Sequence, residues 1–244
     1  MITNDAWLAA IFGRTVLRVD VAPGSARAVA DAVRADARTQ RAAFYYARVD
    51  TADIAAVQAL TAAGFGVVDV NVTLDRPPGP APGPVPGIDV GDVRPEDHAD
   101  VLDIAGSAFR YSRFHFDPQI PVAIANRVKR DLIANYIAGR RGERLLVATR
   151  DGRAVGFLAV LVAEAQGKVA RIIDLIATAS EAQGLGVGTA LVAAFVSVAA
   201  RGTDVLRVGT QVANASAIRL YTRLGFQQAR SQYVMHAHVG EVLS

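Results

Sequence analysis

A glycine-rich stretch at residues 183–188, Gln-Gly-Leu-Gly-Val-Gly, has the composition of a phosphate-binding loop. Small residues let consecutive backbone N–H groups turn toward one point, and the N-terminus of the helix predicted after the loop adds positive potential there. No Gly-Lys-Ser/Thr follows, which argues against an ATP-binding P-loop, and the spacing differs from the dinucleotide-binding fingerprint. We interpret the stretch as a cradle for a pyrophosphate. A tight turn beside a close-packed helix is the structural alternative.

A tyrosine on a later predicted helix could supply a proton. Tyr221 lies within residues 214–226, a segment that starts with Asn214 and ends in Gly225-Phe226. A phenol is protonated near neutral pH, because its ordinary pKa is about 10. Placed beside a leaving thiolate, it would act as a general acid. A tyrosine packed on the inner face of the helix is the alternative.

Together, these two motifs and the order of the predicted elements resemble the GNAT superfamily of acyl-CoA-dependent N-acetyltransferases. Residues 183–188 match its Gln/Arg-x-x-Gly-x-Gly/Ala motif, and residues 214–226 match its Asn-x-x-Ala…Tyr-x-x-x-Gly-Phe motif. The resemblance covers roughly residues 88–238. It implies an α/β (α+β) fold with a mixed, mostly antiparallel central sheet flanked by helices. It also implies acetyl-CoA as cosubstrate and no metal.

The resemblance implies roles for individual residues. The strand at 174–178 would expose backbone groups to the pantetheine arm, and an N–H near Leu175 or Ile176 would serve as the oxyanion donor. Asn214 would hydrogen-bond the pantetheine arm, and Tyr221 would protonate the departing thiolate. The implied cofactor-binding residues are Leu175, Ile176, Ala177, Gln183, Gly184, Leu185, Gly186, Val187, Gly188, Thr189, Asn214 and Ala217.

The group that deprotonates the acceptor amine has two candidates. Asp174 is a carboxylate on the central strand, where some superfamily members place an acid, and a salt-bridged aspartate is the alternative. His115 is the second candidate, because a histidine titrates near neutral pH. His236 and His238 alternate on the last predicted strand, which predicts that they share one exposed face. Because these spread histidines have no evident carboxylate partner, we predict no metal site.

The acceptor side of the predicted site is the loop at 109–118, Phe-Arg-Tyr-Ser-Arg-Phe-His-Phe-Asp-Pro. Aromatic rings can stack on a base or a sugar ring, and arginines can hold phosphate. With the run at 206–214, this loop is similar to the TDP-fucosamine acetyltransferases, which acetylate the amine of a nucleotide-linked deoxyamino sugar. The predicted substrate-binding residues are Arg110, Tyr111, Arg113 and His115.

Other functions stay open. The acceptor could be another small amine, such as an antibiotic or a polyamine, although a polyamine site would need acidic residues and the 110–136 region is basic. A non-catalytic acyl-CoA-binding module is an alternative of another class, and the intact Tyr221 argues against it. A regulator that binds nucleic acid is a more distant alternative.

A proline-rich segment divides the chain. Six of the ten prolines lie within residues 77–87, and proline fixes φ and lacks the N–H that helices and inner strands need. We predict an N-terminal partial GNAT-like domain over 1–76, a linker over 77–87 and a catalytic domain over 88–244. A long loop within one domain is the alternative.

A faint internal repeat relates the two predicted domains. Residues 53–65 match residues 214–226 at an offset of 161, and each copy ends in Gly-Phe. The first copy has Leu60 where the second has Tyr221. The N-terminal domain is therefore interpreted as a decayed half of the catalytic domain that lacks the hydroxyl group.

Hydrophobic periodicity and turn residues predict the secondary structure. The predicted helices cover 25–39, 53–64, 95–109, 122–137, 186–200 and 215–224. The predicted strands cover 16–21, 44–49, 67–74, 88–93, 145–149, 154–163, 172–178, 205–212 and 227–238.

Composition sets limits on the class of protein. The chain has 244 residues, of which 52% are hydrophobic and 20% charged, so it is not a disordered chain. The absence of cysteine excludes disulfides, thiolate nucleophiles and thiolate metal sites, and it fits a reducing compartment. We read no secretory signal in the first residues and predict a cytoplasmic location.

Charge and hydropathy restrict the partners. The net charge is +3, and the basic residues are scattered rather than clustered into a stripe, so we predict no nucleic-acid partner. Residues 184–200 carry no charge but lack the flanks of a membrane span, which predicts a buried helix and no membrane partner. The predicted partners are acetyl-CoA and a small-molecule amine, and the sequence is compatible with a homodimer.

Overall fold

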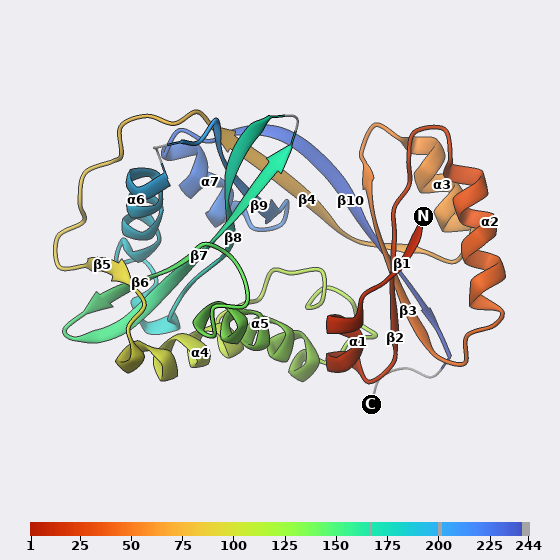
Figure 1. The fold of residues 1–244 in the computed structure, drawn as a ribbon, viewed down its shortest axis with the longest axis horizontal. Coiled ribbons are helices and arrows are strands. Elements are labelled where there is room, and N and C mark those ends of the chain that lie inside the picture. The colour runs from red at the N-terminus through yellow and green to blue at the C-terminus, as the bar shows by residue number, and fades with distance from the viewer. Residues whose placement is uncertain (166, 200–201, 241–244) are drawn as a thin grey trace.

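The computed structural model describes residues 1–165, 167–199 and 202–240, and its strands form one twisted sheet (Figure 1). The strands are β1 (Ile2–Asn4), β2 (Thr15–Val19), β3 (Ala43–Asp50), β4 (Gly66–Arg76), β5 (Asp89–Asp92), β6 (Arg144–Arg150), β7 (Arg153–Ala165), β8 (Lys168–Thr178), β9 (Val205–Gln211) and β10 (Gln227–Val239). Their order across the sheet is β1-β2-β3-β10-β4-β9-β8-β7-β6-β5. Pairs β2–β3 and β8–β9 are parallel and the other described pairs are antiparallel, as the predicted fold requires.

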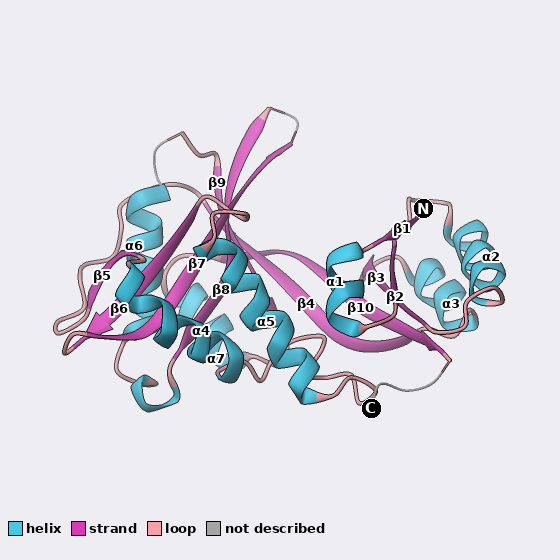
Figure 2. Ribbon diagram, turned by 60° about the horizontal axis from the view of Figure 1, so that its bottom comes forward, coloured by secondary structure: helices cyan, strands magenta, loops and turns pink. Residues whose placement is uncertain are grey.

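Helices cover both faces of this sheet (Figure 2). They are α1 (Ala6–Phe12), α2 (Ala26–Ala37), α3 (Ile54–Ala62), α4 (His98–Ser107), α5 (Val122–Ile137), α6 (Val187–Ala199) and α7 (Ala215–Arg223). Neighbouring residues of β3 point to opposite faces, as the two-residue period of a strand dictates. Tyr45 packs with α2 and α3, whereas Phe44 packs with α1 and the N-terminal part of α5.

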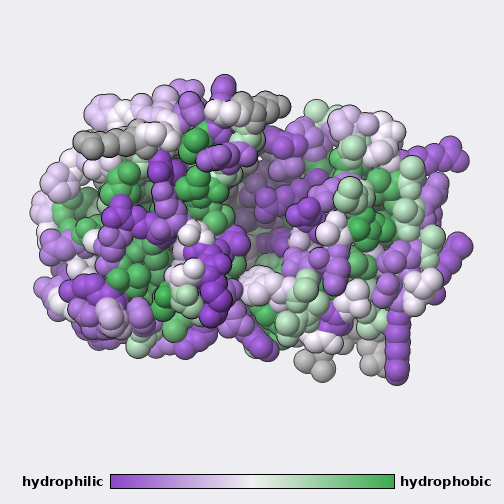
Figure 3. All heavy atoms as spheres, in the orientation of Figure 1, coloured by the Kyte–Doolittle hydropathy of each residue, from purple (hydrophilic) through white to green (hydrophobic). Residues whose placement is uncertain are grey.

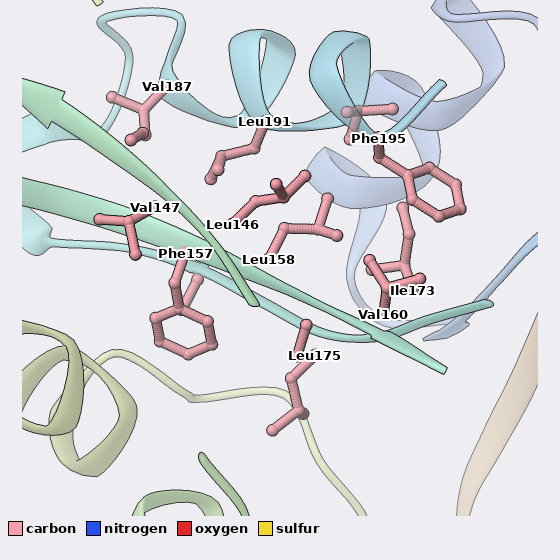
Figure 4. Packing of buried hydrophobic residues seen from close by; sticks show 14 of the residues in the cluster. Leu146, Val147, Phe157, Leu158, Val160, Ile173, Leu175, Val187, Leu191 and Phe195 are labelled. Atoms are coloured by element: carbon pink, nitrogen blue, oxygen red, sulfur yellow. The ribbon is translucent and has the colours of Figure 1, made fainter. Parts of the chain in front are cut away.

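The C-terminal half has the largest hydrophobic core, which Figure 4 shows from close by. Leu191 and Phe195 of α6 lie over Leu146 and Leu158, while Phe157 points to the opposite face of the sheet. A sheet that is covered on both faces is built from nearly continuous apolar strands, which is the pattern of β6 and β7. The uncharged stretch at 184–200 contributes α6 to this core. No helix in the described part of the chain has the length and apolar character needed to cross a bilayer.

The internal repeat extends further than the sequence showed. Helices α2 and α6 begin at 26 and 187, α3 and α7 at 54 and 215, and strands β4 and β10 at 66 and 227, so each pair has the offset of 161. The caps correspond as well: Asp53 and Asn214 accept hydrogen bonds from the N–H groups of Ala56 and Ala217, at 3.0 and 3.2 Å. Each half is therefore built on the same β-α-β-α-β unit.

The two halves exchange their last strands. Strand β10 lies between β3 and β4, and β4 lies between β10 and β9. Residues 77–87 contain no helix or strand, as their prolines predict, and Val85 packs against the main core. The sheet is continuous across the predicted boundary, and the division into 1–76, 77–87 and 88–244 stays a prediction.

The sequence analysis did not predict β1 and α1. Both are short: α1 has 7 residues, too few for a clear helical period. Its N-terminus carries a local signal nonetheless, because the Asp5 carboxylate accepts a hydrogen bond from the N–H of Leu8 at 3.0 Å.

Candidate active site

A cleft of about 1610 Å³ lies between the two halves, where Figure 3 shows a hollow surrounded by hydrophilic side chains. On the C-terminal side it is lined by residues 172–178 of β8, residues 207–211 of β9, the glycine-rich loop and α7. On the other side it is lined by α1, β3 and the connection between α4 and α5. Both halves of the molecule therefore build one cleft.

Strands β8 and β9 separate inside this cleft. Their parallel pairing ends at Ile173 and Val208, and residues 174–178 and 209–211 line the cleft beyond that point. Backbone groups at such an open strand edge can hydrogen-bond an extended ligand as an added strand would. The opening therefore fits an extended, amide-containing chain such as a pantetheine arm.

Asp174 lies at a β-bulge on the wall of the cleft. Its neighbours Ile173 and Leu175 pair with the adjacent β7 residues Val160 and Ala159, so Asp174 is the extra residue of the bulge. A β-bulge changes the direction in which the side chain of its extra residue points. Its Oδ2 accepts hydrogen bonds from the Tyr136 hydroxyl at 2.9 Å and from Arg141 Nε at 2.8 Å. Asp174 is therefore salt-bridged, the alternative that the sequence left open. Its Oδ1 makes no hydrogen bond to a described residue.

The glycine-rich loop has the backbone that its sequence suggests. Gly184 and Gly186 have φ values of 81° and 88°, which residues with a side chain rarely adopt. A Cβ at Gly186 would lie 3.0 Å from a methyl carbon of Val85, whereas one at Gly188 would lie 3.1 Å from Leu220. Gly186 thus lets Val85 pack closely against the loop, and Gly188 lets α6 approach α7. Of the predicted cofactor residues, Leu185 alone lies outside the cleft lining, with 46% of its surface exposed.

Tyr221 is buried, yet it lines the cleft. Its ring packs against Phe226 with centroids 5.9 Å apart, and its hydroxyl makes no hydrogen bond to a described residue. Burial raises the pKa of Tyr221, so the hydroxyl stays protonated at neutral pH and is available to donate. Asn214 also lines the cleft, where its Oδ1 caps α7.

Three of the four predicted acceptor residues also line the cleft: Arg110, Tyr111 and Arg113. The Arg113 guanidinium carbon lies 3.9 Å from the centre of the Tyr46 ring and 4.4 Å from that of Phe114. Such ring contacts hold a guanidinium in place by cation–π attraction.

His115 does not line the cleft, so the structure does not bring it to the predicted site. Its Nε2 lies 2.9 Å from Oδ1 of Asn126, and its Nδ1 lies 2.7 Å from the Ser112 hydroxyl. Burial lowers its pKa. With both ring nitrogens engaged, His115 fixes the loop to α5 and is a poor candidate for the base.

The prediction that His236 and His238 share an exposed face is wrong. Their side chains are 1% and 5% exposed, because this end of β10 is covered by the loop before α5. Oδ2 of Asp117 lies 2.7 Å from His236 Nδ1 and 2.8 Å from His238 Nε2. The two histidines therefore do have a carboxylate partner, which the sequence analysis had not found.

The same three residues could supply metal ligands, since their ligand atoms lie within 4.8 Å of one another. However, Arg14 Nη2 lies 2.7 Å from His238 Nδ1. A guanidinium only donates, so Nδ1 accepts, and the proton of His238 is on Nε2, facing Asp117. This arrangement favours a hydrogen-bonded cluster over a metal site, and the absence of a metal stays a prediction.

The N-terminal half adds residues that the sequence analysis missed. Trp7, Tyr46 and Arg48 line the cleft, and the Tyr46 hydroxyl donates to Oδ2 of Asp5 at 2.7 Å. The alternation of β3 places Tyr46 and Arg48 on one face. The sequence around β3 does not show that this face lines the cleft, because the residues on the opposite side of the cleft lie far away in the chain.

Known proteins agree with this geometry. Residues 141–228 match the family model described as the acetyltransferase (GNAT) domain. Over these residues the chain is similar to the GNAT acetyltransferase domain. The match identifies the protein as an N-acetyltransferase, an enzyme of the acyltransferase class.

Solved structures share its fold. A GCN5-related N-acetyltransferase from Sphaerobacter thermophilus superposes with a TM-score of 0.62 at 16% identity, over 98% of this chain and 76% of that one. A tandem GNAT protein from the clavulanic acid biosynthesis pathway gives 0.60 at 18% identity, over 94% and 77% of the two chains. At such identities the likeness shows the GNAT fold.

Among characterised sequences, the chain is 28% identical over 202 residues to the spore coat polysaccharide biosynthesis protein SpsD of Bacillus subtilis. The match covers 81% of this chain and 68% of that protein.

Proposed function

We propose that the GNAT domain transfers an acetyl group from acetyl-CoA to the amine of a nucleotide-linked deoxyamino sugar. One observation carries the proposal: the open edge of β8, the glycine-rich loop and Tyr221 line the same cleft. Acetyl-CoA supplies the acetyl group as a thioester. The backbone N–H groups of the glycine-rich loop would hold its pyrophosphate, and the open edge of β8 would hold its pantetheine arm.

In this mechanism the amine nitrogen attacks the thioester carbonyl carbon directly, and no acyl-enzyme forms. A backbone N–H of Leu175 or Ile176 donates a hydrogen bond to the oxyanion that develops. The C–S bond then breaks, and Tyr221 donates its proton to the sulfur. Tyr221 suits this step because it is neutral, lines the cleft and has no competing partner among the described residues.

Asp174 is our proposed acceptor for the proton that the amine loses. Both described hydrogen bonds to its carboxylate fall on Oδ2, which leaves Oδ1 for the amine or for a water. We expect Asp174→Asn to lower kcat and to leave acetyl-CoA affinity within about threefold. If kcat is unchanged, Asp174 positions Tyr136 and Arg141 only.

Two features support a sugar acceptor. Aromatic and arginine side chains line the acceptor side of the cleft, where rings can stack on a sugar or a base. The match with a protein of spore coat polysaccharide biosynthesis points the same way. We further propose that the N-terminal half shapes this side and binds no CoA, since Leu60 replaces the tyrosine of its repeat partner. The absence of cysteine also favours a cytoplasmic location.

An acceptor screen with radiolabelled acetyl-CoA tests the proposal. Nucleotide-linked amino sugars are compared with free hexosamines, polyamines and aminoglycosides, and label in the product is measured. Acetylation of a nucleotide-linked sugar is the expected result. Preferred acetylation of an unlinked amine would overturn the acceptor class, and acetyl-CoA binding without turnover of any amine would favour the acyl-CoA-binding module.

A further inference from the structure

Three cationic side chains meet on the acceptor side of the cleft, each from a different part of the chain. They are Arg48 of β3, Arg113 of the connection between α4 and α5, and Lys129 of α5. Arg113 lies against two aromatic rings, and Lys129 Nζ lies 5.0 Å from the centre of the Phe109 ring. Among the described residues, no carboxylate oxygen lies within 4.0 Å of any of the three cations.

The surrounding charge does not neutralise this group. Nine arginine and lysine side chains line the cleft, against two carboxylates in the described chain, Asp5 and Asp174. Two of the nine, Arg18 and Arg207, pair with Asp20 and Asp75 outside the lining. Both carboxylates already have partners: Asp5 accepts from Tyr46, and Asp174 accepts from Tyr136 and Arg141. Asp69 attracts Arg48 electrostatically, but its carboxylate oxygens lie beyond the 4.0 Å N···O distance of an ion pair. The acceptor side therefore holds an excess of positive charge.

Arg113 and Lys129 are held in the cleft at a cost in free energy. Burial lowers the pKa of Arg113 to about 10, and burial with the neighbouring charge of Arg113 lowers the pKa of Lys129 to about 8. Nη1 of Arg113 is buried without a hydrogen-bond partner in the described structure. A buried donor without an acceptor is unfavourable, and like charges at close range repel. An anion bound among the three cations would relieve both costs.

We propose that Arg48, Arg113 and Lys129 form a subsite for the phosphate or diphosphate group of the acceptor. Three cations suit a group with more than one negative charge, and a guanidinium presents paired donors that match phosphate oxygens. The assignment deepens the proposed acetyl transfer and rests on it for the identity of the amine-bearing molecule. It makes the N-terminal half, through Arg48, part of the acceptor site.

Calorimetric titration of the whole protein with inorganic pyrophosphate tests the subsite directly. The protein is first saturated with CoA, so that the glycine-rich loop is occupied and cannot bind the probe. We expect binding that weakens as salt rises, because the contacts are charge-assisted. No binding at low salt in the CoA-saturated protein would overturn the proposal. The titration measures no turnover, so its outcome is independent of the acetyl-transfer test.

Single substitutions test whether Arg48, Arg113 and Lys129 bind the pyrophosphate. Arg48→Gln, Arg113→Gln and Lys129→Gln should each weaken pyrophosphate binding about tenfold or more, in line with the loss of a charge-assisted contact. Their CoA affinity should stay unchanged. Arg34→Gln is the matched control, since Arg34 is an exposed arginine of α2 outside the cleft. If all three cleft variants bind pyrophosphate as the control does, the subsite is wrong.

Two further probes separate the sources of the phosphate. Uridine diphosphate represents a nucleotide-linked acceptor, and glucosamine 6-phosphate represents a sugar phosphate. The probe that binds the CoA-saturated protein more tightly identifies the source of the phosphate, provided that Arg48→Gln also weakens the binding of that probe. If a probe binds all three cleft variants as tightly as it binds the parent protein, the result counts against the subsite.

Discussion

Asp174 of β8 and Tyr221 of α7 both line the cleft. At this scale the chemistry depends on two protonation states. Tyr221 must keep its proton until the sulfur carries charge, and its burial ensures this. Asp174 must accept the proton of the amine, and Arg141 Nε holds its Oδ2 at 2.8 Å while Oδ1 makes no hydrogen bond to a described residue.

We expect Tyr221→Phe to lower kcat by about a hundred- to a thousandfold, the lower part of the usual range for general acids, since water can substitute partly. Acetyl-CoA affinity should change by less than about threefold, because the hydroxyl matters when the sulfur becomes negative and not before. The ring remains on Phe226. Steady-state kinetics and calorimetry measure the two quantities. A near-normal kcat would make Tyr221 a packing residue, and joint loss of affinity and turnover would make it a binding residue.

The buried cluster of Asp117, His236 and His238 should make stability depend on pH. Burial lowers the pKa of His236 from 6.5 to about 4, so the unfolded chain takes up a proton in this range while the folded chain resists it. Stability is therefore lost as the pH falls from 6.5 to 4, by roughly 3 kcal/mol from this group. Hydrogen bonds from both histidines outweigh burial and lower the pKa of Asp117, so its contribution is lost only at still lower pH.

Urea unfolding at a series of pH values measures this effect. The free energy of unfolding of the parent protein should fall more steeply between pH 6.5 and 4 than that of His236→Gln. Both proteins share every other titrating group, so the difference in slope isolates His236. Equal slopes would show that His236 does not titrate in this way.

At the scale of elements, the glycine-rich loop and α6 act together. The loop turns through Gly184 and Gly186 at positive φ and leads directly into α6, whose N-terminus faces the cleft. A helix N-terminus favours anions, and Gly186 and Gly188 at the start of α6 carry no side chains. Asp117, in the connection between α4 and α5, is hydrogen-bonded to His236 and His238 of β10. These contacts anchor the acceptor side of the cleft to β10.

We expect Gly186→Val to weaken CoA binding by more than tenfold, because the side chain would occupy the loop and strain its backbone. Gly24→Val is the matched control: Gly24 also has positive φ, at 76°, but lies before α2 in the other half with open space around it. Both variants should lose some stability, and only Gly186→Val should lose the CoA-dependent rise in Tm. A full CoA response in Gly186→Val would refute the placement of the pyrophosphate.

At the scale of the molecule, the exchanged strands make the two halves interdependent. Strand β10 pairs with β3 from Gln232 to Val239, and with β4 along much of its length. A chain that starts at Ile88 would lack β3 and β4, so β9 would lose one neighbour and β10 would lose both. We therefore expect the C-terminal half to fold poorly by itself, although it carries the cofactor motifs.

Cutting the linker tests this interdependence without removing any strand. A protease site inserted near Gly83, in the irregular segment 77–87, should allow cleavage into two pieces that still elute together on a sizing column. Their CoA response should persist, since the sheet and the cleft stay intact. Separation of the pieces under native conditions would show that the exchanged strands do not hold the halves together.

Most of the elements and the contiguous motifs of the predicted donor side can be read from the amino-acid sequence. The helix at 122–137, the strands at 145–149 and 154–163 and the glycine-rich loop depend on periodicity and backbone preferences that act within a few residues. The motif containing Tyr221 is likewise contiguous. Such features are readable from one chain because the interactions that create them are local.

Contacts between residues far apart in the chain become visible in the folded structure alone. It placed Arg48 opposite Arg113, joined Asp117 to His236 and His238, and inserted β10 between β3 and β4. The alternation of residues in β10 predicts that the strand has two faces, but it does not show which other elements cover each face. For this reason the sequence analysis predicts His236 and His238 at the surface, although they are buried. Strand pairing between residues nearly 190 apart depends on the packing of the whole sheet, and no local preference encodes it.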